Sequence, residues 1–323
     1  MNQIKNTLLR FQSIIALVAL CIVLTLLSDK FLTPENGWNI MRQISINVCI
    51  SVGMTLVILT RGIDLSVGSI LAFSGAVTAG LLKYGVELPA FNVFMEFTVF
   101  GAILGGLLVG GCLGTFNGWM ITRFKVPPFV ATLAMLTIAR GATMLWTGGF
   151  PITGLGTTFA FIGTGWFLGI PMPVWIMAVL VGLAMFVTHK MVFGRYIYAV
   201  GGNESAARLS GIDIKKIKVW VYALAGILAA VGGIMLTSRL DSAQPNAGMS
   251  YELDSIAAVV IGGTSLSGGR GSIMGTVQGA LIIGVLNSGL VLLNVSPFWQ
   301  QIIKGFVILI AVILDRLNHP NED

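Results

Sequence analysis

The stretch Val52–Ala72, VGMTLVILTRGIDLSVGSILA, places a short polar segment between two apolar runs. The apolar runs continue on both sides toward the ~20 residues that a helix needs to cross a bilayer. Backbone that leaves the helix at membrane depth is tolerated only where protein or a water-filled cavity satisfies its polar groups. The stretch therefore predicts a membrane helix that is broken near residues 60–68, with Arg61 and Asp64 inside the break.

The composition of the whole chain indicates the same class of protein. Of its 323 residues, 55% are hydrophobic and only 10% are charged, whereas a soluble protein carries about 25% charged residues. We therefore predict an all-α polytopic membrane protein that forms one transmembrane domain over residues 1–323. The net charge of +6 does not indicate a nucleic-acid partner, because excess Lys and Arg in a membrane protein usually mark its cytoplasmic loops.

The sequence shows no pattern of catalytic or metal-binding residues. The three cysteines lie inside apolar runs and the two histidines stand far apart, which predicts neither a disulfide framework nor a metal site. No Ser/His/Asp set and no pair of carboxylates has supporting context. We therefore predict that the chain is not an enzyme and that it carries no cofactor of its own.

Apolar segments of membrane-spanning length recur along the chain and predict about ten helices. The predicted spans are residues 12–28, 41–60, 65–82, 93–121, 128–147, 173–190, 218–237, 253–267, 272–293 and 299–315. With the N-terminus in the cytoplasm, 12 of the 19 basic residues fall on the cytoplasmic side, as the positive-inside rule requires. We therefore predict cytoplasmic termini, a cytoplasmic loop at 190–217 and external loops at 148–172 and 238–252.

One predicted span carries glycines at four-residue spacing, at positions 106, 110, 114 and 118. Small residues at this spacing let helix backbones approach closely inside a membrane. We interpret this ridge as a helix-packing surface and not as a cofactor motif.

A second Gly- and Ser-rich interruption, GGTSLSGGRGS, occupies residues 262–272. It lies in the other half of the chain from the first, and paired interruptions of this kind point to a transport pathway. The segment lacks the lysine of a phosphate-binding loop, so we do not expect this chain to hydrolyse ATP by itself. Our candidates for the translocation pathway are Asn47, Asp64, Ser66, Ser69 and Asn287.

Asp64 allows three interpretations, because an acid within a membrane span rarely faces lipid. Its carboxylate can cap a helix that begins at Leu65 by accepting the free N–H groups of Ser66 or Val67. It can also pair with Arg61, or it can contact the transported molecule.

The stretch GGNESAARLSG at residues 201–211 predicts a short capped helix in the most basic cytoplasmic loop. Asn203 is a good N-cap, Glu204 suits the positive end of the helix dipole, and Gly211 supplies a left-handed stop. The pair Gly201-Gly202 before it is predicted to be flexible. A helix this short is marginal alone, so we expect it to pack against a partner protein; the alternative is an ordered loop without a partner.

These residues carry a resemblance to a known family. GRYIYAV at 194–200 followed by GGNESAARLSGI resembles the coupling-loop signature of the ABC importer permeases for monosaccharides. Residues 52–72 and 238–271 resemble the same family, nearly the whole chain is covered, and the bacterial ribose permeases are the most similar group. Arg61 departs from the pattern, since the family is expected to carry glycine or another small residue there.

The resemblance implies a permease domain that works as a homodimer in the bacterial cytoplasmic membrane. It implies a separate cytoplasmic ATPase that binds ATP and Mg²⁺, an extracytoplasmic sugar-binding protein, and a monosaccharide substrate, D-ribose, with xylose or galactose as alternatives. The ATPase would be coupled through Gly201, Gly202, Asn203, Glu204, Ala206, Ala207, Arg208 and Gly211. The binding protein would dock at Arg239, Asp241, Gln244 and Glu252.

The main rival is a secondary sugar transporter driven by an ion gradient. Such a transporter needs a buried relay of ionisable residues, for which the sequence offers only Asp64 and Glu96, the latter expected near the outer interface.

Overall fold

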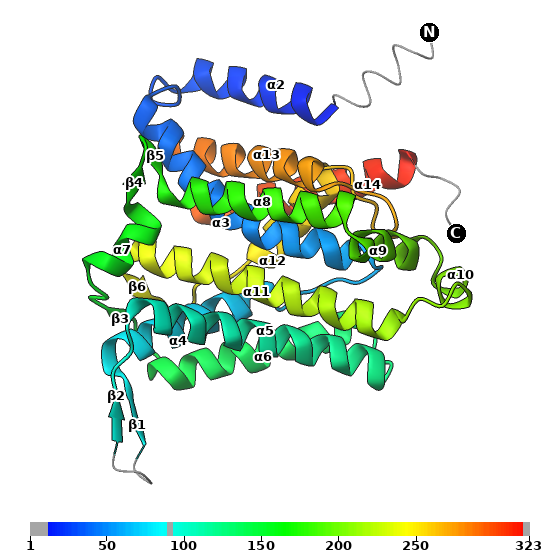
Figure 1. Ribbon diagram of the computed structural model, residues 1–323. Helices are drawn as coiled ribbons and strands as arrows, with labels where there is room; N and C mark the ends of the chain where they lie inside the picture. The colour runs from blue at the N-terminus through cyan, green and yellow to red at the C-terminus, as the bar shows by residue number, and fades with distance from the viewer. Residues whose placement is uncertain (1–11, 89–92, 319–323) are drawn as a thin grey trace.

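The computed structural model describes residues 12–88 and 93–318, and its helices lie side by side in one bundle (Figure 1). The helices are α2 (Gln12–Leu27), α3 (Pro34–Leu59), α4 (Val67–Tyr84), α5 (Val99–Arg123), α6 (Pro128–Thr147), α7 (Thr157–Thr164), α8 (Met172–Lys190), α9 (Val192–Gly202), α10 (Glu204–Leu209), α11 (Ile214–Leu240), α12 (Tyr251–Ile261), α13 (Ile273–Leu292) and α14 (Pro297–Asn318). Hydroxyl side chains begin several of them: Thr33, Thr98 and Ser272 each accept a first-turn N–H, as N-caps do.

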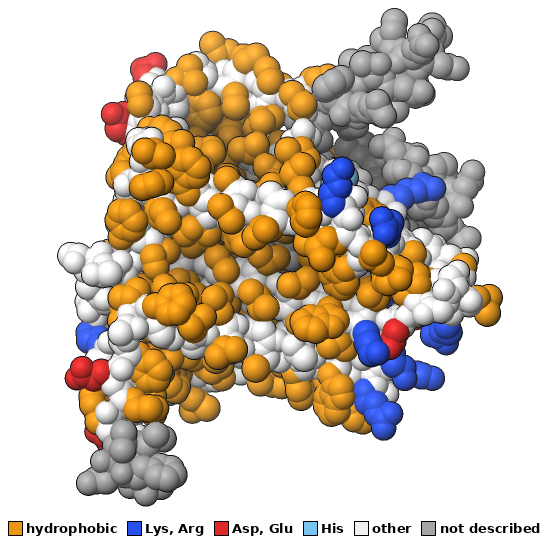
Figure 2. Space-filling model, viewed as in Figure 1, with side chains coloured by type: hydrophobic (Ala, Val, Ile, Leu, Met, Phe, Trp, Pro, Cys, Tyr) orange, Lys and Arg blue, Asp and Glu red, His pale blue; other side chains and the backbone are white. Residues whose placement is uncertain are grey.

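Helix α3 is the centre of the bundle. It packs against α8, α11, α12 and α13, and 89% of its most apolar 18-residue segment is buried, against 11% for α8. The flank of the molecule is covered by hydrophobic side chains, as Figure 2 shows. A buried central helix and an apolar flank are what a polytopic protein in lipid requires, because the outer side chains face hydrocarbon instead of water.

The glycine ridge of α5 is a packing surface, as the sequence indicates. Helix α5 makes its most extensive contact with α11. A Cβ atom added at Gly114 would lie 2.2 Å from the carbonyl oxygen of Tyr222, and one at Gly118 would lie 2.7 Å from Cα of Val219. Only hydrogen fits at these positions, so larger residues would push the two helices apart.

The two ends of the bundle differ in structure and in charge. Three short antiparallel pairs lie at the end opposite α10: β1 (Val86–Leu88) with β2 (Val93–Met95), β3 (Ile152–Thr153) with β6 (Ser242–Ala243), and β4 (Trp166–Phe167) with β5 (Ile170–Pro171). The β3–β6 pair joins the two loops that the sequence predicts to be external. Lys and Arg gather at the opposite end, around α9 and α10 (Figure 2).

Seven of the described helices are long and apolar enough to cross a membrane: α3, α4, α5, α6, α8, α11 and α13. Helices α2 and α14 contain shorter apolar segments, and α12 has 11 residues. Several predicted boundaries were wrong, and the largest shift is in α3, which begins at Pro34 instead of residue 41. The span predicted at 93–121 begins at Val99 because β2 occupies the residues before it, and the span predicted at 253–267 stops at Ile261, where the helix break starts.

Candidate functional site

The first helix break begins with a left-handed residue. Helix α3 ends at Leu59 and α4 starts at Val67, and between them Arg61 has φ = 61°. The Arg61 N–H donates to the Ile58 carbonyl (2.9 Å) and the Gly62 N–H donates to the Val57 carbonyl (3.0 Å), the pattern of a Schellman helix end.

Glycine usually occupies the left-handed position of this motif. Glycine takes this position after α10, where Gly211 has φ = 83°, and after α12, where Gly263 has φ = 82°. At Arg61 the left-handed conformation costs about 1 kcal/mol relative to glycine. This cost gives a physical reason why glycine or another small residue is expected there.

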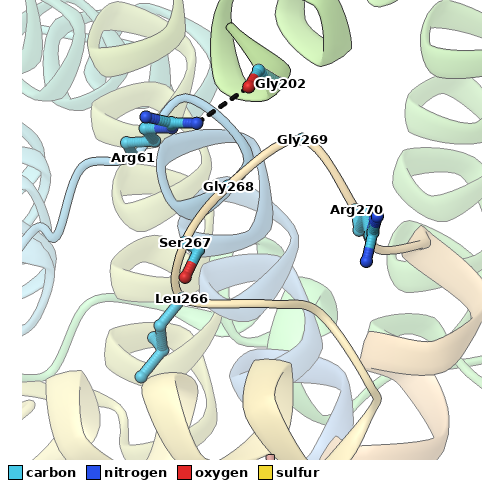
Figure 3. Close-up of a pocket in the computed structure, with 7 residues that line it drawn as sticks. All are labelled: Arg61, Gly202, Leu266, Ser267, Gly268, Gly269 and Arg270. Atoms are coloured by element: carbon cyan, nitrogen blue, oxygen red, sulfur yellow. Dashed lines mark hydrogen bonds between the residues drawn. The ribbon is translucent and has the colours of Figure 1, made fainter. Parts of the chain in front are cut away.

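The side chain of Arg61 caps the end of α9. Its Nε donates to the Gly201 carbonyl (2.7 Å) and its Nη2 to the Gly202 carbonyl (2.8 Å), as Figure 3 shows for the second bond. The last carbonyls of a helix have no partner within the helix and carry the negative end of its dipole. A guanidinium at this point satisfies them and ties the first break to α9.

The second break meets the same point. Helix α12 ends at Ile261 and α13 begins at Ile273, and between them the Gly269 N–H donates to the Leu59 carbonyl (3.0 Å). The Tyr198 hydroxyl on α9 donates to the Gly271 carbonyl (3.0 Å). We call this meeting of both breaks with the end of α9 the junction, formed by residues 59–61, 198–202 and 268–271.

Gly201 lies at the tightest point of the junction. A Cβ atom there would lie 1.7 Å from the Leu59 carbonyl oxygen and 2.5 Å from the Gly269 nitrogen, whereas a Cβ at Gly202 would meet nothing within 4 Å. The prediction that Gly201-Gly202 is a flexible pair was wrong. Both residues belong to α9, whose apolar face is buried, so the segment folds as a helix.

A cavity of about 590 Å³ opens beside the junction. It is lined by Arg61, Gly202, Leu266, Ser267, Gly268, Gly269 and Arg270 (Figure 3). Its walls therefore come from both breaks and from α9, so a movement of α9 relative to the breaks changes its shape.

Helix α10 projects from the basic end next to the junction. Asn203 Oδ1 accepts the Ala206 N–H (3.0 Å) and Gly211 forms the left-handed stop, the geometry that the sequence indicates. Glu204 accepts from Lys218 Nζ at 2.7 Å, which anchors α10 to α11.

Ala207 is only 5% exposed and packs with buried residues of α11, whereas Leu209 is 90% exposed. The small alanine at 207 thus serves the fold of α10. Sequence reasoning missed Leu209 as the most exposed apolar side chain of α10. An isolated leucine at the end of a polar helix was the signal that could have identified it.

Three of the pathway candidates form one buried network at the start of α4. Asp64 Oδ1 accepts the Ser66 N–H (2.9 Å) and the Ser66 hydroxyl (2.5 Å). Asn117 Nδ2 on α5 donates to Ser66 Oγ (2.9 Å), and Ser69 Oγ donates to the Ser66 carbonyl (2.9 Å). Asp64 therefore accepts the Ser66 N–H, as the first interpretation expects, but the helix begins at Val67 and not at Leu65, so Asp64 holds the turn before α4. The side chain of Arg61 is directed to α9.

The other two pathway candidates lie elsewhere. Asn47 on α3 and Asn287 on α13 are buried, and these helices pack together with Thr55 and Thr276 joined by a 2.6 Å hydrogen bond between their hydroxyls. Neither asparagine lines the cavity at the junction. Their place in a pathway stays a prediction.

The predicted docking residues hold the loop after α11 to its neighbours. Arg239 Nη2 donates to Asn39 Oδ1 (2.9 Å), Asp241 Oδ1 accepts the Leu155 N–H (2.9 Å), and Gln244 Nε2 donates to Ser242 Oγ (3.0 Å). Glu252 lies beside Gly68 of α4. Gln244 and Asp241 are exposed at the end that carries the β-strands. Glu96 is also exposed, directly after β2.

Sequence reasoning also missed an ion pair inside the bundle. Lys304 Nζ on α14 lies 3.0 Å from Asp254 Oδ2 on α12, and Asp254 is only 4% exposed. Each charge adjoins a long apolar run of its helix, which is a signal for a buried pair.

Comparison with known proteins identifies relatives over nearly the whole chain. Residues 37–312 match the family model described as "Branched-chain amino acid transport system / permease component". The ribose import permease protein RbsC of Bacillus subtilis is 54% identical over 304 residues, covering 94% of this chain and 91% of that protein. RbsC of Haemophilus influenzae is 49% identical over 318 residues (97% and 95%). The D-allose transport system permease protein AlsC of Escherichia coli is 40% identical over 289 residues (90% and 86%). No solved structure matches the chain.

Proposed function

Because this chain belongs to the family of branched-chain amino acid transport system permease components, we propose that it is the membrane-spanning subunit of an ATP-binding-cassette importer for D-ribose. It is a non-catalytic subunit of the bacterial cytoplasmic membrane. A separate ATPase binds ATP and Mg²⁺ and drives transport, and an extracytoplasmic binding protein delivers the sugar.

The observation that carries this proposal is the junction. Helix α10 and the end of α9 form one continuous unit on the basic end of the bundle, and the Arg61 and Gly269 hydrogen bonds connect that unit to both helix breaks. When the ATPase displaces α10, α9 moves with it and shifts both breaks together. Breaks that respond as a pair are suited to open and close a path between the two membrane faces.

We also propose a topology for the chain. The chain crosses the membrane ten times, with α2, α12 and α14 joining the seven longer helices, and both termini are cytoplasmic. The basic end that carries α10 then faces the cytoplasm, in agreement with the positive-inside rule. The strand-bearing end, with Asp241 and Gln244 exposed, faces the binding protein. Two copies of the chain form the transport path between them.

D-ribose is the proposed substrate because two relatives named as ribose import permeases share 49–54% of their residues with this chain. The relative named for D-allose is less similar, at 40%. The path receives the sugar from the binding protein, so the pathway candidates Asn47, Asp64, Ser66, Ser69 and Asn287 act on gating and on passage more than on sugar choice.

The experiment is uptake of radiolabelled D-ribose by vesicles that contain the purified chain. We expect accumulation only when the ATPase, ATP and the binding protein are all present, and a smaller rate with D-allose. Accumulation driven by a proton or sodium gradient without the ATPase and the binding protein would overturn the proposal in favour of a secondary transporter.

A further inference from the structure

A second cavity, of about 330 Å³, lies between the last turn of α5 and the first turns of α11. It is lined by Trp119, Thr122, Arg123, Lys215, Lys216, Val219 and Trp220. These residues belong neither to the junction nor to the candidate pathway. Both helices are long and apolar enough to span a membrane, so the cavity lies where two spanning helices reach the basic end of the bundle.

The glycine ridge of α5 shapes this cavity. Gly118 brings α5 against the backbone of α11 at Val219, and Val219 is one of the residues that line the cavity. The bulky neighbours Trp119 and Trp220 lie outside this contact and are 47% and 61% exposed. Trp119 packs edge-on against Phe124 at 5.2 Å between ring centroids. Exposed indoles at the end of a spanning helix are typical of the boundary between hydrocarbon and headgroups.

The polar side of the cavity is positively charged. Arg123 and Lys215 are exposed side chains. Lys216 lies 3.3 Å from Asp213, and the Lys216 backbone N–H, donated to Asp213, holds the pKa of that carboxyl below its usual range. Asp213 therefore stays ionised and offsets one of the three cations, so the site as a whole attracts an anion.

We propose that this cavity binds one anionic phospholipid, with its phosphate between Arg123 and Lys215 and its acyl chains along the Trp119 and Trp220 rings. A basic pocket between spanning helices on the cytoplasmic side fits such a headgroup. The exposed indoles favour a lipid over an acidic segment of the partner ATPase, because the exposed rings of Phe116 and Phe124 contact Trp119 and extend its apolar surface. The bound lipid fixes the crossing of α5 and α11 next to α10, which is anchored on α11 through Lys218.

The test compares lipid binding by the full chain and two matched double variants. Delipidated protein in detergent is titrated with phosphatidylglycerol or phosphatidylcholine, and bound lipid is counted by native mass spectrometry. The variant Arg123→Gln/Lys215→Gln removes two cations from the site. The control Lys190→Gln/Arg195→Gln removes two exposed cations from α8 and α9 at the same end of the bundle.

We expect one tightly bound phosphatidylglycerol per chain and about 30-fold weaker binding in the Arg123/Lys215 variant, since each cation near an anionic headgroup contributes roughly a fivefold gain in affinity. The control variant should bind like the native chain. The variant Trp119→Ala/Trp220→Ala should also weaken phosphatidylglycerol binding, because the acyl chains lose their two rings.

Three outcomes would overturn the proposal. Equal binding of phosphatidylcholine and phosphatidylglycerol would remove the charge argument. Competition by soluble glycerol phosphate at the same concentration as the lipid would show a free-phosphate site. Unchanged lipid binding in the Arg123/Lys215 variant, together with loss of the ATPase during co-purification, would assign the surface to the partner protein.

Discussion

Replacing Arg61 separates the two effects that this residue combines. Its left-handed backbone is unfavourable by about 1 kcal/mol relative to glycine, and its side chain donates two hydrogen bonds to the last carbonyls of α9. A hydrogen bond from a charged donor contributes roughly 1.5–3 kcal/mol when it is buried. The outer bond is exposed to solvent, so we take a smaller value of about 1 kcal/mol for each bond. Arg61→Ala loses both bonds and keeps the strain, a loss of about 2 kcal/mol; Arg61→Gly loses the bonds but relieves the strain, a loss of about 1 kcal/mol.

The stability difference can be measured through Cys49, which is fully buried in α3. In a background without Cys21 and Cys112, a thiol-reactive dye reports unfolding when Cys49 becomes accessible. Arg61→Gly should unfold at a higher temperature than Arg61→Ala. ATP-driven uptake should fall in both variants, because both release α9 from the first break. If Arg61→Ala were the more stable variant, the strain argument would be wrong, and full uptake by both variants would refute transmission through this contact.

Three further predictions concern the junction, α10 and the ion pair. Gly201→Ala should lower the unfolding temperature strongly, because its Cβ has no room, whereas Gly202→Ala should fold normally; equal behaviour of the two would contradict the packing described at the junction. Leu209→Ser should leave the fold intact and weaken ATPase binding in a pull-down. Ala207→Arg should instead unfold α10, because Ala207 is buried. Unaltered ATPase binding by Leu209→Ser would exclude Leu209 from the contact with the ATPase. Asp254→Ala should destabilise the chain by about 3–5 kcal/mol, because it leaves Lys304 unpaired in the bundle. The double variant Asp254→Ala/Lys304→Met should restore much of that stability. If the double variant were no more stable than Asp254→Ala, the unpaired lysine would not be the cause of the loss.

Hydropathy and local capping rules predict much of this fold. Long apolar segments predicted the seven described helices that are able to span a membrane. Both helix breaks follow from clusters of Gly, Ser and charge between apolar halves. Asn203 and Gly211 mark α10 because N-caps and left-handed stops depend on residues within one turn. Such features are local, so a single sequence contains the information that specifies them.

The junction could not be predicted in the same way. Arg61, Gly201 and Gly269 are far apart in the sequence, and their contacts depend on where α3, α9 and α12 lie in the bundle. The polar character of the 190–217 loop hid α9, although Ile197 and Val200 already indicated an apolar helix face. The buried position of Ala207 and the β3–β6 pair likewise follow from the packed bundle and not from any local pattern.

The β3–β6 pair has a consequence for biogenesis. Its two strands, Ile152–Thr153 and Ser242–Ala243, are separated in the chain by α7, α8, α9, α10 and α11. The pair cannot form during synthesis until α11 has been made, so the end of the bundle opposite α10 stays open while the earlier helices are already complete. Premature chain termination before β6 would therefore yield a molecule whose end opposite α10 lacks the β3–β6 pair, although α7 to α11 are already complete.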